Sequence, residues 1–299
     1  MNADEYYNSL EKEEVNCPVC DSDDQTRLSK GDRYGMGVES RGCNRCGLIF
    51  INPRPTEKEM QKFYATNYRR YYESVEKPTD EYVQAGPFVP RANFVVDCIS
   101  AHFVKDATFK VLDIGCAEGT LLKTISERFP NAELHGLEPD PNFAQFARER
   151  SGAKVLTGDF SEALTNGLES GFDLVTLTHV LEHVLNPTPF LQQIKAILKP
   201  TGYCYVEVPN ISNDRTRYLG HVHLGHVLSF SPQNLSQLLC SNGLAIENEY
   251  LSGLPAKTPA MGFMTRRFGS PVRTEPLAEK QIEDIFERFK SKVAMKILI

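Results

Sequence analysis

The feature that most constrains the fold is the alternation of two kinds of segment between residues 109 and 251. Short apolar runs alternate with longer runs whose apolar residues recur at helical spacing. The apolar runs are KVLDIG, AELHGLEP, AKVLTGD, FDLVTLTH, GYCYVEVP and LAIENEYL. Strands that alternate with helices of this length form a parallel sheet covered on both faces. The sequence therefore predicts an α/β fold.

The pattern divides the chain into four predicted regions. We expect a small cysteine-bearing module over residues 1–55, a helical linker or lid over 56–105, the α/β domain over 106–255 and a helical extension over 256–299. The final hairpin strand of the sheet is not evident, because the chain reads as irregular after residue 252 until a terminal amphipathic helix. Three alternatives stay open: the terminal VAMKILI supplies that strand, VAMKILI is helical, or the chain continues further.

A glycine-bearing turn, DIGCAEG, follows the first predicted strand and runs from Asp113 to Gly119. Glycines between a strand end and a helix start let a ligand approach the backbone closely. Taken alone, such a turn also fits a tight connection that binds nothing. Its GxxxG spacing differs from the GxGxxG of dinucleotide-binding dehydrogenases.

Three further strand ends carry polar groups. Glu138 ends the next strand, about 20 residues beyond the glycines, where an acid can accept both hydroxyls of a ribose. Asp159, followed by Phe160, ends the third strand and can reach an adenine amino group. The fourth strand leads into Thr178 and His179. Ligands of open α/β sheets bind at the carboxyl ends of the strands, so these groups predict one cofactor site.

As a set, these segments resemble the class I S-adenosylmethionine-dependent methyltransferases over roughly residues 90–250. DIGCAEG resembles the first motif of that family, with Ala117 in place of its usual third glycine. GLEPD resembles the ribose-binding motif, GDF the adenine-side motif and THVLEHV the segment after the fourth strand. The resemblance implies a Rossmann-like sheet flanked by helices and a site for S-adenosyl-L-methionine. The cofactor-binding residues that it implies are Asp113, Gly115, Cys116, Ala117, Gly119, Glu138, Pro139, Asp159, Phe160, Thr178 and His179.

Two CxxC pairs lie in the N-terminal region, Cys17 with Cys20 and Cys43 with Cys46, and 22 residues separate the pairs. Two such turns bring four thiolates to one tetrahedral ion. Four protein ligands leave no open position, so we expect a structural Zn²⁺ and a zinc-ribbon-like module. Four unrelated thiols, a redox pair and an iron–sulfur cluster are the alternatives.

This arrangement, followed by a tyrosine-rich helix, resembles the zinc-bearing methyltransferases of sugar and natural-product pathways. In that group the module and its tyrosines cover the substrate, which implies such a position for Tyr64, Tyr68, Tyr71 and Tyr72. Ordinary packing is the alternative for each tyrosine. Residues 1–55 carry seven Lys/Arg against ten Asp/Glu, and the whole chain has a net charge of −6. Because nucleic-acid binders usually carry a basic face, we interpret the module as a lid or an interaction module and expect no nucleic-acid partner.

Histidines are the candidate bases on the acceptor side. His179 and His183 flank Glu182, whereas His221, His223 and His226 lie in the loop GHVHLGHVLSFSPQNL. The sugar C-methyltransferases have a Glu-His pair in that loop, with the histidine as base.

In this chain Gly225 replaces the acid of that pair and His226 remains. We expect His226, His183 and Glu182 to be the catalytic residues. The alternatives are packing for His183, anchoring of the loop for Glu182, and a second metal bound by the HxHxxH histidines of the loop.

These features predict methyl transfer to a small polar acceptor in a biosynthetic pathway: a sugar, a nucleotide-linked sugar or a related metabolite, methylated at oxygen or carbon. An RNA or protein methyltransferase that uses the module for recognition is one alternative, and a non-catalytic cofactor-binding protein is another. No apolar run is long enough to span a membrane, and the acidic start MNADEYYNSLEKEEVN is unlike a signal peptide. We expect a cytoplasmic monomer or homodimer.

Overall fold

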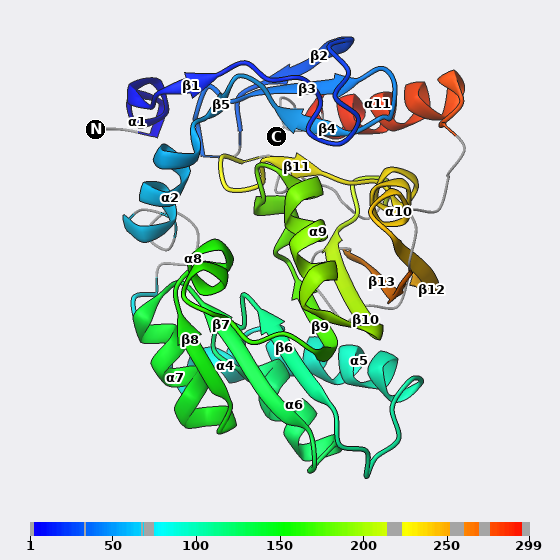
Figure 1. The fold of residues 1–299 in the computed structure, drawn as a ribbon. Coiled ribbons are helices and arrows are strands. Elements are labelled where there is room, and N and C mark those ends of the chain that lie inside the picture. Colours follow the sequence, from blue (N-terminus) through cyan, green and yellow to red (C-terminus); the bar gives the residue numbers. More distant parts are fainter. Residues whose placement is uncertain are drawn as a thin grey trace.

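The structure is a computed structural model that describes residues 3–32, 34–66, 68, 75–213, 223–251, 260–268 and 276–294. Within these ranges the chain forms sheets of seven, four and two strands, with helices packed around them (Figure 1). Three residues singled out above, Tyr71, Tyr72 and His221, lie outside the described residues, as do the last five residues of VAMKILI.

The large sheet follows the predicted alternation of strands and helices. Its strands are β6 (Lys110–Ile114), β7 (Glu133–Glu138), β8 (Lys154–Thr157), β9 (Phe172–Thr178), β10 (Leu198–Pro209), β12 (Leu244–Tyr250) and β13 (Ala260–Arg267). They lie in the order β12-β13-β10-β9-β6-β7-β8. The pairs of β6 with β7, β7 with β8, β6 with β9 and β9 with β10 are parallel. The predicted Rossmann-like α/β fold is confirmed.

The final hairpin strand corrects one expectation. β13 pairs antiparallel with both β10 and β12, so residues 260–267 belong to the sheet and not to a helical extension over 256–299. The sequence of β13, AMGFMTRR, lies within a stretch that reads as irregular. Its first six residues are buried, because β13 lies between two other strands. A strand buried on both faces lacks the polar–apolar alternation by which a strand is recognised.

Helices cover both faces of the large sheet. One face packs against α5 (Phe88–Ser100), α6 (Thr120–Arg128) and α7 (Pro141–Ser151), and the other against α8 (Phe160–Thr165), α9 (Pro187–Ile197) and α10 (Pro232–Ser241). Val111 and Leu112, neighbours on β6, belong to the two different cores, as the period of a strand requires. No described helix combines the length and the apolar character needed to cross a membrane.

Local sequence signals set several helix ends. The Asp140 side chain accepts hydrogen bonds from the first amides of α7, and Gly152 ends that helix with a φ of 70°. Ser231 begins α10 with a capping box. Side-chain caps of this kind satisfy backbone donors that have no partner inside the helix. A short helix α4 (Asp80–Ala85) precedes α5, and a single 3-10 turn, η1 (Leu181–His183), follows β9.

The N-terminal module is built from several parts of the chain. Its strands β2 (Gln25–Lys30), β3 (Glu39–Cys43) and β4 (Ile49–Ile51) form one sheet with β11 (Leu228–Ser229), and β1 (Lys12–Glu13) pairs with β5 (Arg54–Pro55). The helices α1 (Ala3–Ser9) and α2 (Glu57–Thr66) lie at one side of these strands, and α11 (Glu279–Ala294) at the other (Figure 1). β11 follows β10 in the chain, so the module is joined to the α/β domain through a shared sheet.

Candidate active site and cysteine cluster

A cavity of about 470 Å³ lies at the carboxyl ends of the parallel strands. It opens where the chain order reverses between the neighbouring strands β6 and β9, which is the usual ligand position in such sheets. The lining residues include two tyrosines of the α2 region, four residues of α5, the turn after β6, the ends of β7 and β9, and three histidines. They are Tyr64, Tyr68, Phe88, Arg91, Ala92, Val95, Asp113, Gly115, Cys116, Ala117, Glu118, Thr120, Leu121, Glu138, Pro139, Asp140, Thr178, His179, Val180, His183 and His226.

The turn after β6 has the backbone shape expected of a ligand-binding loop. Gly115 and Ala117 have φ values of 71° and 45°, and a Cβ on Gly115 would lie 2.8 Å from Val180 Cγ2. Gly119 has a different role, because a Cβ there would lie 2.8 Å from the Cα of Ala147. The last glycine therefore allows α6 to pack closely on α7, and it does not line the cavity.

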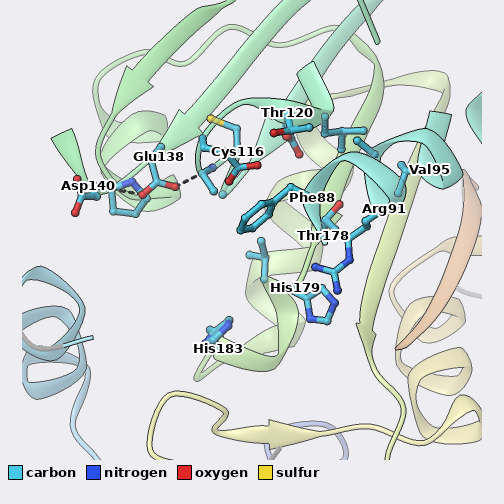
Figure 2. A pocket seen from close by; sticks show the side chains of 18 of the residues that line it. Phe88, Arg91, Val95, Cys116, Thr120, Glu138, Asp140, Thr178, His179 and His183 are labelled. Carbon is cyan, nitrogen blue, oxygen red and sulfur yellow. Dashed lines mark hydrogen bonds between the residues drawn. The ribbon is translucent and has the colours of Figure 1, made fainter. Parts of the chain in front are cut away.

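Glu138 is held in a fixed position at one end of the cavity (Figure 2). One carboxylate oxygen accepts a hydrogen bond from the Ala117 amide at 3.1 Å, and the other accepts one from the Asp140 amide at 2.9 Å. The residue is only 6% exposed. Each carboxylate oxygen has two lone pairs, so these bonds leave acceptor capacity for a ligand.

Asp113 is buried at the end of β6 and accepts a hydrogen bond from the Thr176 hydroxyl at 2.7 Å. Burial raises the pKa of its carboxyl group to about 7, since the charged form loses its hydration. The Thr176 hydrogen bond acts against this rise, and the nearby carboxylates Glu118 and Glu138 add to it.

Besides Gly119, two of the expected cofactor residues lie outside the cavity lining. Asp159 is the N-cap of α8, and its side chain accepts a hydrogen bond from the Glu162 amide at 2.8 Å. Phe160 is buried and packs edge-on against Phe190. The short helix α8 was not expected from the sequence, although Asp159 followed three residues later by Glu162 is a capping-box signal.

The sequence motifs did not indicate an ion network that lies on the floor of the cavity. Arg91 lies 3.1 Å from Glu207, His179 Nε2 lies 3.3 Å from the same carboxylate, and His179 Nδ1 lies 2.9 Å from Glu182. Figure 2 shows the Arg91 side chain directed toward His179. An acidic residue inside the otherwise apolar run GYCYVEVP is unusual, and this position was the sequence signal that could have indicated Glu207. Arg91 precedes the first strand and carried no signal.

Electrostatic interactions favour the charged forms of His179 and Glu182. Burial and the Arg91 charge would lower the pKa of His179, but the hydrogen bond and charge of Glu182, together with Glu207, outweigh them and the pKa is raised. Burial would raise the pKa of Glu182, but the hydrogen bond and charge of His179 outweigh it and the pKa is lowered. The two carboxylates on either side of His179 thus favour its protonated form. Its φ of 57°, in the left-handed region, is a strained backbone conformation for a non-glycine residue.

His183 and His226 meet at the other end of the cavity, with their ring centroids 4.8 Å apart. His183 Nδ1 lies 2.7 Å from the Gly225 carbonyl oxygen, so this nitrogen carries a proton and, in the neutral imidazole, Nε2 carries the lone pair. The Tyr64 hydroxyl donates to the same carbonyl at 2.9 Å. The structure thus brings Tyr64, His183 and His226 together from three distant parts of the chain.

His223 lies beneath His226 and not in the cavity lining. It is 3% exposed, its ring centroid is 3.9 Å from that of His226, and its Nδ1 accepts a hydrogen bond from the Gly225 amide at 3.1 Å. Of the two described histidines of the HxHxxH pattern, only His226 therefore lines the cavity.

The four cysteines of the module form one cluster, with their sulfur atoms within 4.8 Å of one another. Both CxxC turns have the same hydrogen bonds. The amides of Asp21 and Gly47 each donate to the carbonyl of the cysteine four residues earlier, at 2.9 Å. Asp21 and Gly47 also share a positive φ, 57° and 70°. Sequence spacing alone predicted this meeting of four sulfurs.

The cluster fits a tetrahedral ion. The sulfur atoms of Cys17 and Cys46 are 3.6 Å apart, and those of Cys20 and Cys43 are 3.5 Å apart. Four sulfurs at about 2.3 Å from one zinc ion are separated by about 3.8 Å. The two CxxC turns thus have matching backbone conformations, and their sulfur atoms are separated by nearly the distance that a bound zinc ion requires.

A family profile described as a methyltransferase domain matches residues 57–249 of this chain. The matched range includes the turn after β6, Glu138 and the histidines of the cavity. The chain is a methyltransferase. It belongs to the S-adenosylmethionine-dependent enzymes with the Rossmann-like fold, as the sequence motifs indicated.

Curated relatives of the methyltransferase include ubiquinone biosynthesis O-methyltransferases. That of Idiomarina loihiensis is 28% identical over 169 residues, which cover 52% of this chain and 68% of the relative. That of Rickettsia felis is 23% identical over 147 residues, which cover 48% of this chain and 59% of the relative. The matches thus span only about three-fifths to two-thirds of the relatives' own lengths.

Solved structures show the same fold as the methyltransferase. A Burkholderia thailandensis 1,6-didemethyltoxoflavin-N1-methyltransferase, solved with its substrate and S-adenosylhomocysteine, is 16% identical and has a TM-score of 0.57 over 80% of this chain and all of that chain. The plantazolicin methyltransferase BpumL, solved with a monoazolic desmethylPZN analogue and S-adenosylhomocysteine, is 15% identical with a TM-score of 0.53 over 70% of this chain and 94% of that chain.

Proposed function

We propose that this chain transfers the methyl group of S-adenosylmethionine to an oxygen atom of a small polar acceptor. One observation carries the proposal: a single cavity holds Glu138 at one end and the pair His183 and His226 at the other. A site for the methyl donor and a group that can take a proton from the acceptor thus share one cavity. The O-methyltransferases among the relatives support oxygen as the acceptor atom.

The cofactor end of the cavity has buried polar groups whose hydrogen bonds a ligand could complete. The hydroxyl oxygens of Thr120 and Thr178 are buried and have no hydrogen-bond partner among the described residues. Both line the cavity. Buried polar groups without partners are costly, so their presence indicates a bound polar molecule. Glu138 would hold the ribose hydroxyls, and the turn at Gly115 would lie against the cofactor backbone.

The acceptor end would activate and position a hydroxyl group. The cofactor, when bound, supplies an electrophilic methyl group on a sulfonium, so the protein's part is to orient the acceptor and accept its proton. Hydrogen bonding of His183 Nδ1 to Gly225 fixes the imidazole with its lone pair on Nε2, the form needed in a base. Tyr64, Tyr68 and Phe88 give this space aromatic walls.

The narrower acceptor class follows from the sequence resemblance. A sugar, a nucleotide-linked sugar or a related metabolite carries several hydroxyls. Such a molecule suits a cavity that has polar groups at its two ends and aromatic side chains along its walls.

The four-cysteine cluster would hold a structural Zn²⁺ and thereby keep α2 and Tyr64 over this space. Cys17, Cys20, Cys43 and Cys46 fit that role because all four ligands are protein thiols.

Replacement of Glu138 tests the cofactor site. Glu138→Ala removes acceptors of charged hydrogen bonds, so it should weaken S-adenosylhomocysteine binding by about 1–3 kcal/mol, measured by calorimetry. Glu149→Ala, an exposed acid on the nearby helix α7, is the matched control and should bind like the wild type. Equal affinities for all three proteins would refute the assignment of Glu138.

Product analysis tests the reaction itself. A labelled-methyl assay with a cell metabolite extract, read by mass spectrometry, should yield a methylated small hydroxylated product. Label found only in RNA or protein would instead favour a macromolecular acceptor. Cofactor binding without transfer to any acceptor would indicate a non-catalytic protein.

A further inference from the structure

The Gly225 carbonyl links two side chains that line the acceptor end of the cavity. It accepts hydrogen bonds from the Tyr64 hydroxyl at 2.9 Å and from His183 Nδ1 at 2.7 Å. A carbonyl oxygen has two lone pairs, so it can serve both donors at once. The orientation of both side chains therefore depends on the position of one peptide group.

His223 fixes that peptide group from the opposite side. The Gly225 carbonyl and the His226 amide belong to one planar trans unit, in which the C=O and the N–H point in opposite directions. The His226 amide donates to the His223 carbonyl at 2.8 Å, so the Gly225 carbonyl is directed away from His223. The Gly225 amide donates to His223 Nδ1 at 3.1 Å. Two amides of the turn are thus bonded to His223, one to its ring and one to its backbone.

Close packing explains why the middle of this turn is glycine. A Cβ on Gly225 would lie 3.0 Å from His223 Cε1 and 3.2 Å from Tyr68 Cε2. Carbon atoms in favourable contact are about 3.5–4.0 Å apart, so both rings would have to move. The position at which the sugar C-methyltransferases carry an acid therefore has no room for a side chain while the His223 ring lies against the turn.

The cysteine-bearing module supports His223. His223 is buried, and the Tyr34 ring packs edge-on against it, with the centroids 6.0 Å apart and the planes at 82°. The Asp32 side chain accepts hydrogen bonds from the amides of Tyr34 and Met36 at 2.8 and 2.9 Å, which hold the segment that carries Tyr34. The His223 ring also packs against that of His226 in the cavity lining. His223 thus connects the module to the acceptor end of the cavity.

We propose that His223 is a positioning residue for methyl transfer: its Nδ1 holds the Gly225 amide, and the turn then directs the Gly225 carbonyl to Tyr64 and His183. The inference rests on the proposed function and deepens it, because it names what orients the acceptor-side groups. His223 does not line the cavity, so it acts through the turn and not by contact with the acceptor. Since its Nδ1 accepts a hydrogen bond, its ring proton lies on Nε2.

Two variants of His223 separate this role from simple packing. An asparagine side chain can accept a hydrogen bond from the amide two residues later, so His223→Asn can keep the bond to Gly225 while it loses the ring. His223→Phe keeps a buried ring and loses the acceptor. The rate of labelled-methyl transfer to a cell metabolite extract is measured at saturating S-adenosylmethionine over a series of extract concentrations. We expect His223→Phe to lower the maximal rate by up to about 100-fold, the scale of a misplaced group, and His223→Asn to be at least about tenfold faster than His223→Phe.

The histidine tautomers give a second measurement that needs no acceptor. Proton–nitrogen NMR of ring-labelled histidines in the full-length wild type should show His223 with its proton on Nε2 and His183 with its proton on Nδ1. Signals are assigned from variants that lack each residue. His183 should keep this tautomer in His223→Asn and lose its preference for it in His223→Phe, because the Gly225 carbonyl is then no longer held.

The outcomes separate this inference from the proposed function. His102→Gln changes a histidine outside the cavity that lies 3.0 Å from Asn248, and it should match the wild type in both measurements. A rate for His223→Phe equal to or above that of His223→Asn is the result that packing alone predicts, and it would overturn the inference. So would a wild-type His223 with its proton on Nδ1, a result that holds even where a variant fails to fold. Absence of transfer by the wild type would remove the proposed function, and the tautomers would still decide whether His223 orients His183.

Discussion

Asp113 is a residue whose acid–base chemistry departs strongly from its ordinary behaviour in water. It is 3% exposed, and its hydrogen bond from Thr176 does not offset the cost of burying its charge. The folded protein therefore holds a proton on Asp113 up to a pKa of about 7, whereas an unfolded chain releases it near 3.9. Between those two values the folded state binds more protons than the unfolded state.

Asp113→Asn tests this proton linkage. In the wild type, the residue should make the free energy of unfolding fall as pH rises from about 4 to about 7, by up to about 1.4 kcal/mol per pH unit. Asparagine has no proton to lose, so the variant should gain stability relative to the wild type across that range. Urea unfolding at about pH 5 and about pH 8 measures the difference. A difference in the free energy of unfolding between the two proteins that stays constant with pH would contradict the expectation.

Among the elements, α11 fixes the cysteine-bearing module from the far end of the chain. Its residues Ile282, Ile285, Phe286 and Phe289 form one apolar cluster with Ile49 of β4. A Cβ on Gly42 would collide with the Phe286 ring, so only glycine allows the helix to lie this close to β3. The contact ties the second CxxC turn to residues more than 200 positions later.

Phe286→Ala should destabilise the module. Removal of a buried aromatic ring costs about 3–5 kcal/mol, and part of that cost arises from the cavity left behind. We expect a lower thermal midpoint for the transition of the module, measured by scanning calorimetry. Phe268→Ala removes the same ring from a site that is 54% exposed and should leave the midpoint almost unchanged. Similar midpoints for both variants would show that α11 does not support the module.

In the whole molecule, the module and the α/β domain share one apolar core and one sheet. Phe50 of the module and Met60 of α2 pack in the same cluster as Leu177 and Leu181 near the cavity. Arg54 also donates a hydrogen bond to the Leu185 carbonyl. Because α2 follows the module directly, the position of Tyr64 over His183 depends on the fold of the module.

Loss of the proposed zinc should therefore lower activity without removing the cofactor site. Cys43→Ser should release the metal and unfold residues near both CxxC turns, because metal binding and folding are coupled in such modules. We expect strongly reduced methyl transfer, with S-adenosylhomocysteine affinity changed less than about threefold, or 0.7 kcal/mol. Cys240→Ser, at a cysteine outside the cluster, is the control. Metal analysis that finds no zinc in the wild type would refute the proposal.

The sequence by itself determined the alternating order of strands and helices, the meeting of the four cysteines, and the glycine turn with Glu138 one strand later. These features depend on local spacing: the period of apolar residues, the two CxxC intervals and the position of polar groups at strand ends. Parallel strands bring their carboxyl ends to one edge, so the position of Glu138 beside the turn followed without knowledge of the packing.

Only the tertiary structure decided the features that depend on distant contacts. β13 became a strand because β10 and β12 both offer it hydrogen bonds, although its sequence has no strand-like alternation. Arg91, His179 and Glu207 became an ion network because three elements meet at the cavity floor. His183 and His226 meet because a loop crosses the same sheet edge. The energies of such contacts arise between segments far apart in the chain, so no local pattern records them.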